Sequence, residues 1–149
     1  MRLAYERDDV GIITPTNTEV TTFTGLHLYH NAVSNCSQRV RLALAEKSLD
    51  FTSHHLDLSK DEHVTDAYLG INPNGVVPTL VDNGTVVIES NDILAYLDEH
   101  YPTPQLQPSA AADHDAMREW MERAAALQRT IKTLSMYFLF LPFVRKSAE

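Results

Sequence analysis

The sequence has 149 residues, 44% of them apolar, and a formal net charge of −8 from 12 Lys and Arg against 20 Asp and Glu. This length fits one ordinary domain, or a small domain with part of another. Nucleic acids and anionic membranes bind basic surfaces, so the acidic balance argues against both as partners. A single cysteine excludes an internal disulfide framework and indicates a reducing compartment.

The first 25 residues are rich in threonine and lack the periodicity of a helix or strand. Their apolar run, residues 10–13, is far shorter than the apolar core of a signal peptide. We therefore expect residues 1–25 to form a flexible leader, with an additional ordered strand as the alternative. The sequence contains no run of about 18 apolar residues, which argues against a membrane span and makes the cytoplasm the expected location.

From residue 26 onward the pattern becomes regular. Apolar alternation and helical spacing predict four elements in succession, which are a buried strand at 26–30, a helix at 36–48, a strand at 51–58 and a short helix at 60–71. Ser59 or Asp61 is the expected cap of the short helix.

Two β-branched runs then flank Asn83-Gly84, and such a pair between such runs predicts a β-hairpin. The next helix is expected at 90–101, with Ser90 as its N-cap. The predicted order of elements from residue 26 is therefore β-α-β-α-β-β-α.

Three prolines between residues 102 and 108 indicate a linker. Beyond it, apolar residues recur mostly at steps of three and four, which predicts one long helix with an apolar stripe. The stripe consists of Met117, Trp120, Met121, Ala124, Leu127, Ile131 and Leu134. We expect this stripe, and the strongly apolar segment 136–143, to be covered by a partner surface.

Four stretches carry a resemblance to a known family, and they are LYHNAVSNCSQRVRLALAEK at 28–47, DEHVTDAYLGINPNG at 61–75, VVPTL at 76–80 and ESNDILAYL at 89–97. In this order and spacing they resemble the N-terminal thioredoxin-like domain of cytosolic glutathione transferases, in particular the serine-type theta- and zeta-like members. The resemblance covers residues 26–101 and implies an α/β fold with a four-stranded mixed sheet. Residues 102–108 would then be the linker, and residues 109–149 the beginning of the family's all-α second domain, which is normally far longer.

Pro78 directly precedes an apolar strand, where it removes no ladder hydrogen bond. The resemblance implies that the Val77-Pro78 bond is cis. It also implies that the backbone of Val77 pairs with the cysteinyl part of glutathione in the manner of an added strand. A trans proline that merely starts a strand is the alternative interpretation.

Glu89 and Ser90 lie at a strand-to-helix junction, where free backbone amides attract an anion. The resemblance implies that Ser90 holds the γ-glutamyl carboxylate of glutathione and that Glu89 reaches its ammonium, whereas simple helix capping is the alternative. It also places His63 at the glycyl carboxylate, with Lys60 as a secondary helper. An exposed histidine and lysine without a role are the alternative there.

Ser34 and Cys36 stand where a strand meets a helix. A glutathione thiol has a pKa of about 8.5, and lowering it by about two units takes roughly 2.7 kcal/mol. A hydroxyl donor at a helix N-terminus has an effect of that size, since each charge-assisted hydrogen bond supplies roughly 1.5 to 3 kcal/mol. The resemblance places Ser34 on the catalytic serine, as a donor to the glutathione sulfur, and His30 where tyrosine-type members keep their phenol.

Cys36 lies two residues further, and helical spacing places it with Val40, Ala43 and Leu44 on the inward face. Core packing is one interpretation of this cysteine. The other follows from the run S-x-C-S, which resembles zeta-like isomerases and reductive dehalogenases. In those enzymes a cysteine at this spacing forms a mixed disulfide with glutathione or assists the chemistry.

The resemblance therefore implies a glutathione transferase that joins the glutathione thiolate to an electrophilic apolar small molecule, with glutathione as co-substrate and no metal. Two alternatives remain, a zeta-like isomerase or reductive dehalogenase that uses Cys36, and a non-catalytic glutathione-fold binding or regulatory module. Family members commonly form homodimers, and we expect the same association here.

Overall fold

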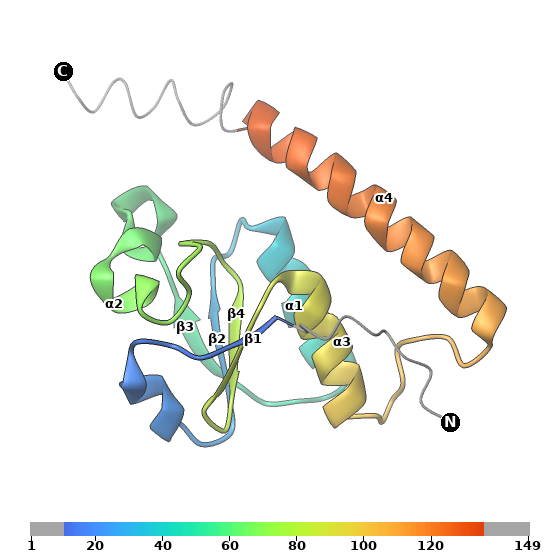
Figure 1. Ribbon diagram of the computed structural model, residues 1–149, viewed down its shortest axis with the longest axis horizontal. Coiled ribbons are helices and arrows are strands. Elements are labelled where there is room, and N and C mark those ends of the chain that lie inside the picture. Colours follow the sequence, from blue (N-terminus) through green and yellow to red (C-terminus); the bar gives the residue numbers. More distant parts are fainter. Residues whose placement is uncertain (1–10, 136–149) are drawn as a thin grey trace. The chain divides into compact units, whose positions relative to one another are not determined.

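The computed structural model describes residues 11–135 (Figure 1). The chain divides into two units after Leu106, and each is described by itself. Within the described residues, no helix combines the length and the apolar character needed to cross a bilayer. The expected boundaries at 26–101, 102–108 and 109–149 remain predictions.

The first unit contains a mixed five-stranded sheet in the order β1-β5-β4-β2-β3. Its strands are β1 (Ile12–Ile13), β2 (Leu26–His30), β3 (Thr52–His55), β4 (Thr79–Asp82) and β5 (Thr85–Ile88). The β2 and β3 strands are parallel, and the other pairs are antiparallel. From β2 to the helix after β5, the elements follow the predicted order.

The predicted number of four strands is wrong, because Ile12 and Ile13 pair with Val87 and Val86 at the edge of β5. These residues belong to the segment expected as a flexible leader, and a 3-10 helix follows at Thr18–Thr22. Val20 of that helix is almost fully buried under the sheet. A two-residue strand has no periodicity of its own, so its pairing depends on tertiary contacts that sequence patterns do not reveal.

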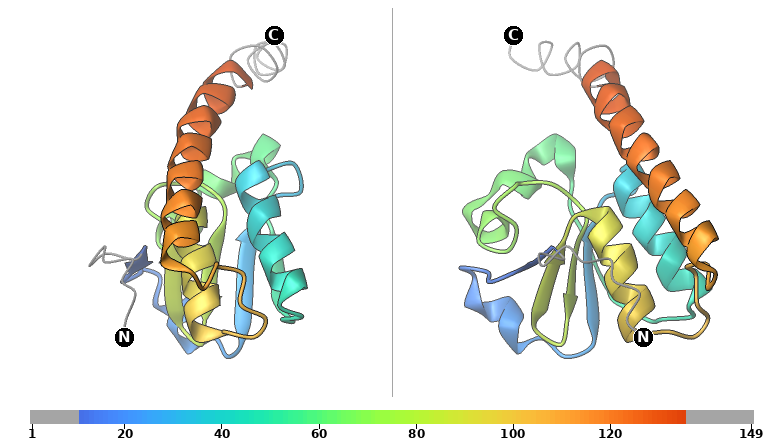
Figure 2. Two further views of the ribbon diagram at one scale, coloured as in Figure 1. Left: turned by 90° about the vertical axis from the view of Figure 1, so that its right-hand side faces the viewer. Right: turned by 45° about the vertical axis from the view of Figure 1, so that its right-hand side comes forward.

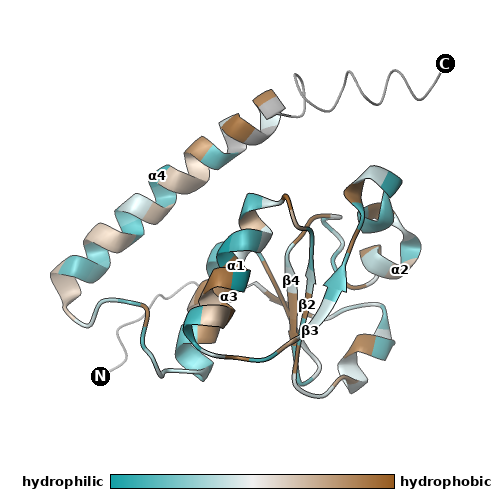
Figure 3. Cartoon of the chain, turned by 180° about the vertical axis from the view of Figure 1, so that it is seen from behind, coloured by the Kyte–Doolittle hydropathy of each residue, from teal (hydrophilic) through white to brown (hydrophobic). Residues whose placement is uncertain are grey.

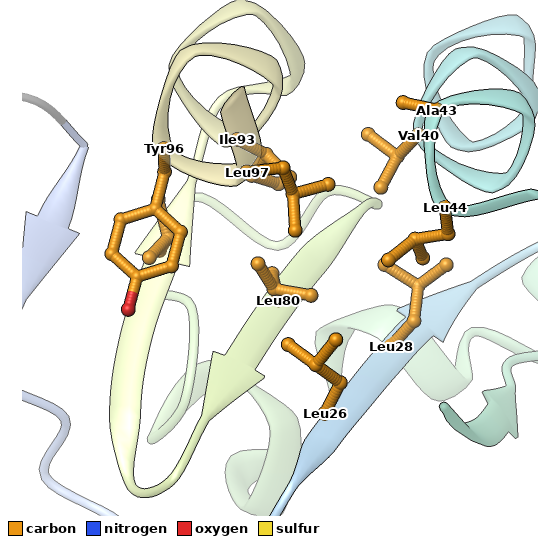
Figure 4. Packing of buried hydrophobic residues seen from close by; sticks show 10 residues of the cluster. Leu26, Leu28, Val40, Ala43, Leu44, Leu80, Ile93, Tyr96 and Leu97 are labelled. Carbon is orange, nitrogen blue, oxygen red and sulfur yellow. The ribbon is translucent and has the colours of Figure 1, made fainter. Parts of the chain in front are cut away.

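Alternating side chains divide the sheet into two apolar faces. One face packs against α1 (Asn35–Glu46) and α3 (Ser90–His100), and Leu28 and Leu80 project toward these helices in Figure 4. The other face carries Val81 and Val86 and packs against α2 (Asp66–Leu69) and the 3-10 helix. The two helical layers on opposite faces are visible in Figures 1 and 2. The result is an α-β-α layering in which both faces of the sheet are covered, consistent with the buried side chains on both sides of β4 and β5.

The helix expected at 60–71 is broken into three pieces. Two 3-10 turns, Leu58–Lys60 and Glu62–Val64, precede α2. Asp57 caps the first turn by accepting from the Ser59 amide at 3.0 Å, and Thr65 caps α2. Ser59 is therefore not a cap, whereas Asp61 stands at the N-cap of the second turn, with left-handed backbone at φ 57° and without a side-chain capping bond.

The predicted hairpin at Asn83-Gly84 is confirmed, with Asp82 opposite Thr85. Both turn residues have positive φ, 46° and 85°, which is the type I′ geometry that favours Asn-Gly. A Cβ at residue 84 would lie 2.4 Å from the Thr21 carbonyl oxygen, so close backbone packing also requires glycine here.

The second unit contains α4 (Ala111–Ser135), a single helix of 25 residues at the place where the stripe predicts one. Polar and apolar residues alternate along it in Figure 3. Trp120, Leu127, Ile131 and Leu134 are exposed. The apolar segment 136–143 lies outside the described residues.

A buried lysine connects α1, α3 and the segment after α3. The Lys47 ammonium forms an ion pair with Asp98 and donates to the carbonyls of Tyr101 and Pro104 at 2.8 and 2.7 Å. The same Asp98 carboxylate accepts from the Leu106 amide at 2.8 Å. Every donor of the ammonium is thus used, as a buried charge requires.

We expect Lys47→Met to lower the free energy of unfolding by about 3 kcal/mol, because Asp98 would lose its buried counter-charge. Urea denaturation of the purified variant measures this loss. Lys60→Met is the matched control, since its exposed pair with Asp57 spans 3.3 Å and should contribute less than about 1 kcal/mol. Equal losses in the two variants would contradict the assignment.

Candidate functional site

The register of the sheet brings three chain segments together at one edge, which is the edge formed by the ends of β2 and β5 and the start of β4. Thr79, the first residue of β4, lies between Tyr29 near the end of β2 and Ile88 at the end of β5. The loop after β2, the loop before β4 and the junction after β5 therefore meet at the same edge (Figure 1). These loops carry the predicted site residues Ser34, Val77, Pro78, Glu89 and Ser90.

Ser34 is the N-cap of α1, and its Oγ accepts from the Ser37 amide at 3.2 Å. The serine is half-buried, and this bond does not use its hydroxyl proton. Asn31 holds the preceding loop by accepting from the Val33 amide at 3.0 Å and donating to the Leu56 carbonyl at 2.8 Å. Ser34 is thus a fixed hydroxyl at the start of a helix.

Cys36 is a free, half-buried thiol in the first turn of α1 and belongs to neither core cluster. Val40, Ala43 and Leu44 are buried as predicted, but Ser37 takes the inward position ahead of them. Core packing is therefore the wrong interpretation of Cys36, because Ser37 lies three residues before Val40 and fills that position. The Ser37 hydroxyl accepts from the backbone amide of Asn31 at 3.3 Å.

The Val77-Pro78 peptide bond is cis, as the resemblance implies. A buried polar network that the sequence patterns do not reveal holds this loop. The Val76 carbonyl accepts from the Tyr68 hydroxyl at 2.7 Å and from the side-chain amide of Asn72 at 2.9 Å. The hydroxyl and the side-chain amide each form a further hydrogen bond with Thr79 Oγ1. Burial raises the pKa of Tyr68 to about 12. One sequence feature that indicates this network is the presence of Tyr68 and Asn72 at otherwise apolar positions shortly before Pro73.

The junction after β5 differs from the prediction. Ser90 is the first residue of α3, and the N-cap is Glu89, which has φ 65° and makes no side-chain capping bond. Ser90 Oγ instead accepts from the guanidinium of Arg39 at 3.4 Å. Glu89 is exposed, and its carboxylate accepts from the Asn74 side-chain amide at 3.4 Å. The hydroxyl of Ser90 is therefore not a helix cap.

His63 lies in the second 3-10 turn, half-buried, with no hydrogen-bond partner at Nδ1. A Cβ added at Gly75 would lie 3.4 Å from the His63 carbonyl oxygen, so the turn packs beside the loop that leads to Pro78. Lys60 is exposed and paired with Asp57 at 3.3 Å. The structure thus brings His63 to the loop before β4, whereas the ammonium of Lys60 pairs with Asp57.

His30, at the position where the resemblance places a phenol in tyrosine-type members, is buried and bonds to Ser53 Oγ at 2.7 Å. Burial lowers the pKa of His30, and the nearby charge of Arg41 lowers it further. The imidazole therefore stays neutral at pH 7. Its hydrogen bond links β2 to β3 and does not contribute to the candidate site.

The edge as a whole combines two helix N-termini, two hydroxyls and one carboxylate. Positive helix ends and free amides stabilise anions, including a thiolate. Among residues 11–135, no three His, Cys, Asp or Glu side chains converge as metal ligands would. The chemistry that these groups support is binding of a charged, zwitterionic ligand and stabilisation of an anion.

Comparisons with known proteins identify relatives of the first unit. The sequence pattern of the glutathione S-transferase N-terminal domain matches residues 28–105. Glutathione S-transferase 1 of Dianthus caryophyllus is 43% identical over 83 residues, which are 56% of this chain and 38% of that protein. Maleylacetoacetate isomerase of Pseudomonas aeruginosa is 44% identical over 104 residues, which are 68% and 46% of the two chains.

Among solved structures, human glutathione transferase theta-2 in complex with glutathione is similar with a TM-score of 0.66 and 31% identity. The similarity covers 68% of this chain and 42% of that one. It confirms the predicted thioredoxin-like α/β fold. The chain spans less than half the length of both curated relatives it matches above.

Tyr68→Phe tests the network under the loop before β4. Below pH 10 we expect the variant to lose about 1 to 3 kcal/mol of unfolding free energy, because Thr79 and Val76 lose a buried partner. The folded-state pKa of about 12 lies above the unfolded value of 10.0, so the neutral phenol stabilises the fold below pH 10 and this contribution disappears as pH rises through 12. The difference between wild type and variant in urea denaturation should therefore stay constant up to about pH 10 and shrink as pH rises from 10 towards 12. A constant difference would contradict the role of Tyr68.

Proposed function

Because the chain belongs to the glutathione S-transferase N-terminal domain family, we propose that it binds glutathione and acts as the glutathione-binding part of a glutathione transferase. The observation that carries this proposal is the register of β2, β4 and β5, which gathers the candidate residues at one sheet edge. The human relative with bound glutathione supports the same ligand.

The tripeptide would lie across this edge. Val77, before the cis proline, would offer its backbone to the cysteinyl residue of glutathione. The amides at the start of α3, with Ser90, would bind the γ-glutamyl carboxylate, and the exposed Glu89 would meet the ammonium. His63, whose turn packs beside the same loop, would donate from its imidazole to the glycyl carboxylate.

Ser34 would donate its hydroxyl proton to the glutathione sulfur, because its capping bond uses only the oxygen lone pair. A donated hydrogen bond favours the thiolate, and the positive end of α1 adds to it. The serine is therefore a donor and not a nucleophile, and the attack on an electrophilic carbon comes from the bound sulfur.

An electrophilic apolar small molecule is the second substrate that this mechanism requires. We further propose a homodimer, which the exposed apolar side chains of α4 would help to form. The cytoplasm is the proposed location, as the single cysteine favours a reducing compartment.

The Ser34→Ala variant should retain most of the affinity for glutathione, because the other contacts of the tripeptide remain. The pKa of the bound thiol should rise by about one to two units, the equivalent of one lost charge-assisted hydrogen bond. Ultraviolet absorbance of the thiolate against pH measures this shift, and an assay with a generic aryl halide measures turnover.

Ser59→Ala is the control for this variant, since its hydroxyl is exposed and bonds to Asp57 at 2.6 Å. Thermal unfolding of both variants accounts for the lost N-cap of α1, which costs about 1 kcal/mol. An unchanged thiol pKa and unchanged turnover in Ser34→Ala would show that Ser34 is not the hydrogen-bond donor to the glutathione sulfur. Absence of glutathione binding by the wild type would contradict the proposal itself.

A zeta-like isomerase or thiol-dependent dehalogenase is the second candidate function. It is favoured by the similarity to maleylacetoacetate isomerase and by the half-buried free thiol of Cys36 in the first turn of α1.

Cys36→Ser distinguishes the two functions. If Cys36 takes part, the variant should lose isomerisation of maleylacetoacetate while conjugation to an aryl halide continues, because the conjugation sulfur belongs to glutathione. Both rates are measured on the same preparation. Retained isomerisation in the variant would exclude the cysteine, and glutathione binding without either activity would indicate a non-catalytic module.

A further inference from the structure

Arg39 connects the two helices whose N-termini face the candidate site. It lies one turn into α1, half-buried, and donates to Ser90 Oγ at 3.4 Å. The next arginine of the same helix, Arg41, faces elsewhere and donates to the Ala32 carbonyl at 3.1 Å. Of these two arginines, Arg39 is therefore the one that contacts a residue of the proposed glutathione site.

The contact defines what the Ser90 hydroxyl can do. Its oxygen accepts from the guanidinium, which has no acceptor of its own. The hydroxyl proton must then point away from Arg39. Since Ser90 does not cap α3, its oxygen is not held by a backbone amide of that helix, and the hydroxyl can donate to a ligand on the side away from Arg39.

Charge gives a second reason for a cation here. The junction is acidic, with Glu89 at the N-cap and Asp92 in the first turn of α3, where it accepts from the Gly11 amide at 3.3 Å. Two carboxylates near one helix end oppose the binding of a further carboxylate. A guanidinium next to Ser90 offsets that repulsion.

We propose that Arg39 is a positioning residue that orients the Ser90 hydroxyl as a donor and makes the start of α3 selective for a ligand carboxylate. The inference rests on the proposed glutathione site and deepens it, since it assigns to Arg39 a share in recognition of the γ-glutamyl carboxylate. Arg39 acts through Ser90 and through its charge.

The test compares two ligands on the 149-residue chain by calorimetric titration. One is glutathione, and the other is γ-aminobutyryl-cysteinyl-glycine, which keeps the amine, the thiol and the glycyl carboxylate but lacks the γ-glutamyl carboxylate. Arg39→Gln should weaken glutathione binding about tenfold and change binding of the analogue by less than about twofold. Arg39→Lys, which keeps the charge, should recover part of the loss.

Arg41→Gln is the matched control, because it removes the same charge from the same helix without a contact to Ser90. We expect it to change the affinities for both ligands by the same factor. Ser90→Ala combined with Arg39→Gln should weaken glutathione binding less than the product of the two single effects, since the residues act together.

The outcomes separate this inference from the proposed function. Equal losses for both ligands in Arg39→Gln, or no loss for either, would overturn the role of Arg39 while wild-type binding still supports the site. Failure of the wild type to bind glutathione would overturn both. If Arg39→Gln does not fold, the same ligand comparison with Arg39→Lys and with Ser90→Ala decides the question.

Discussion

The antiparallel pairing of β4 between β2 and β5 is the constraint on which the candidate site depends. Thr79 lies opposite both Tyr29 and Ile88, so the ends of three strands share one edge. A slip of one residue in either pairing would move every side chain of β4 to the opposite face of the sheet. The apolar faces that fix this register are therefore also what brings Ser34, Pro78 and Ser90 together.

Much of this arrangement could be predicted from local patterns. The alternation in residues 26–30 and the Asn83-Gly84 pair predict β2 and the hairpin because strand and turn geometry depend on nearby residues. The helical stripe after residue 116 likewise predicts α4. The family resemblance supplied the roles of the site residues, which local patterns alone left open.

Several features that escaped prediction depend on contacts between segments that are separate in sequence. The pairing of Ile12 with Val87, the bonds from Tyr68 to Thr79, and the contact of Arg39 with Ser90 each join separate segments. The prediction that Ser90 caps α3 was wrong because of backbone geometry. Ser90 has the chemistry of a cap, but the positive φ of Glu89 moves the cap position back by one residue.

The short β1 strand has a consequence for the sheet's outer borders. It covers the backbone of β5, which would otherwise present hydrogen-bonding groups to a neighbouring molecule. At the opposite border, β3 carries only Thr, Ser and His side chains. Pairing of β5 with an edge strand of another molecule is therefore disfavoured where β1 occupies it.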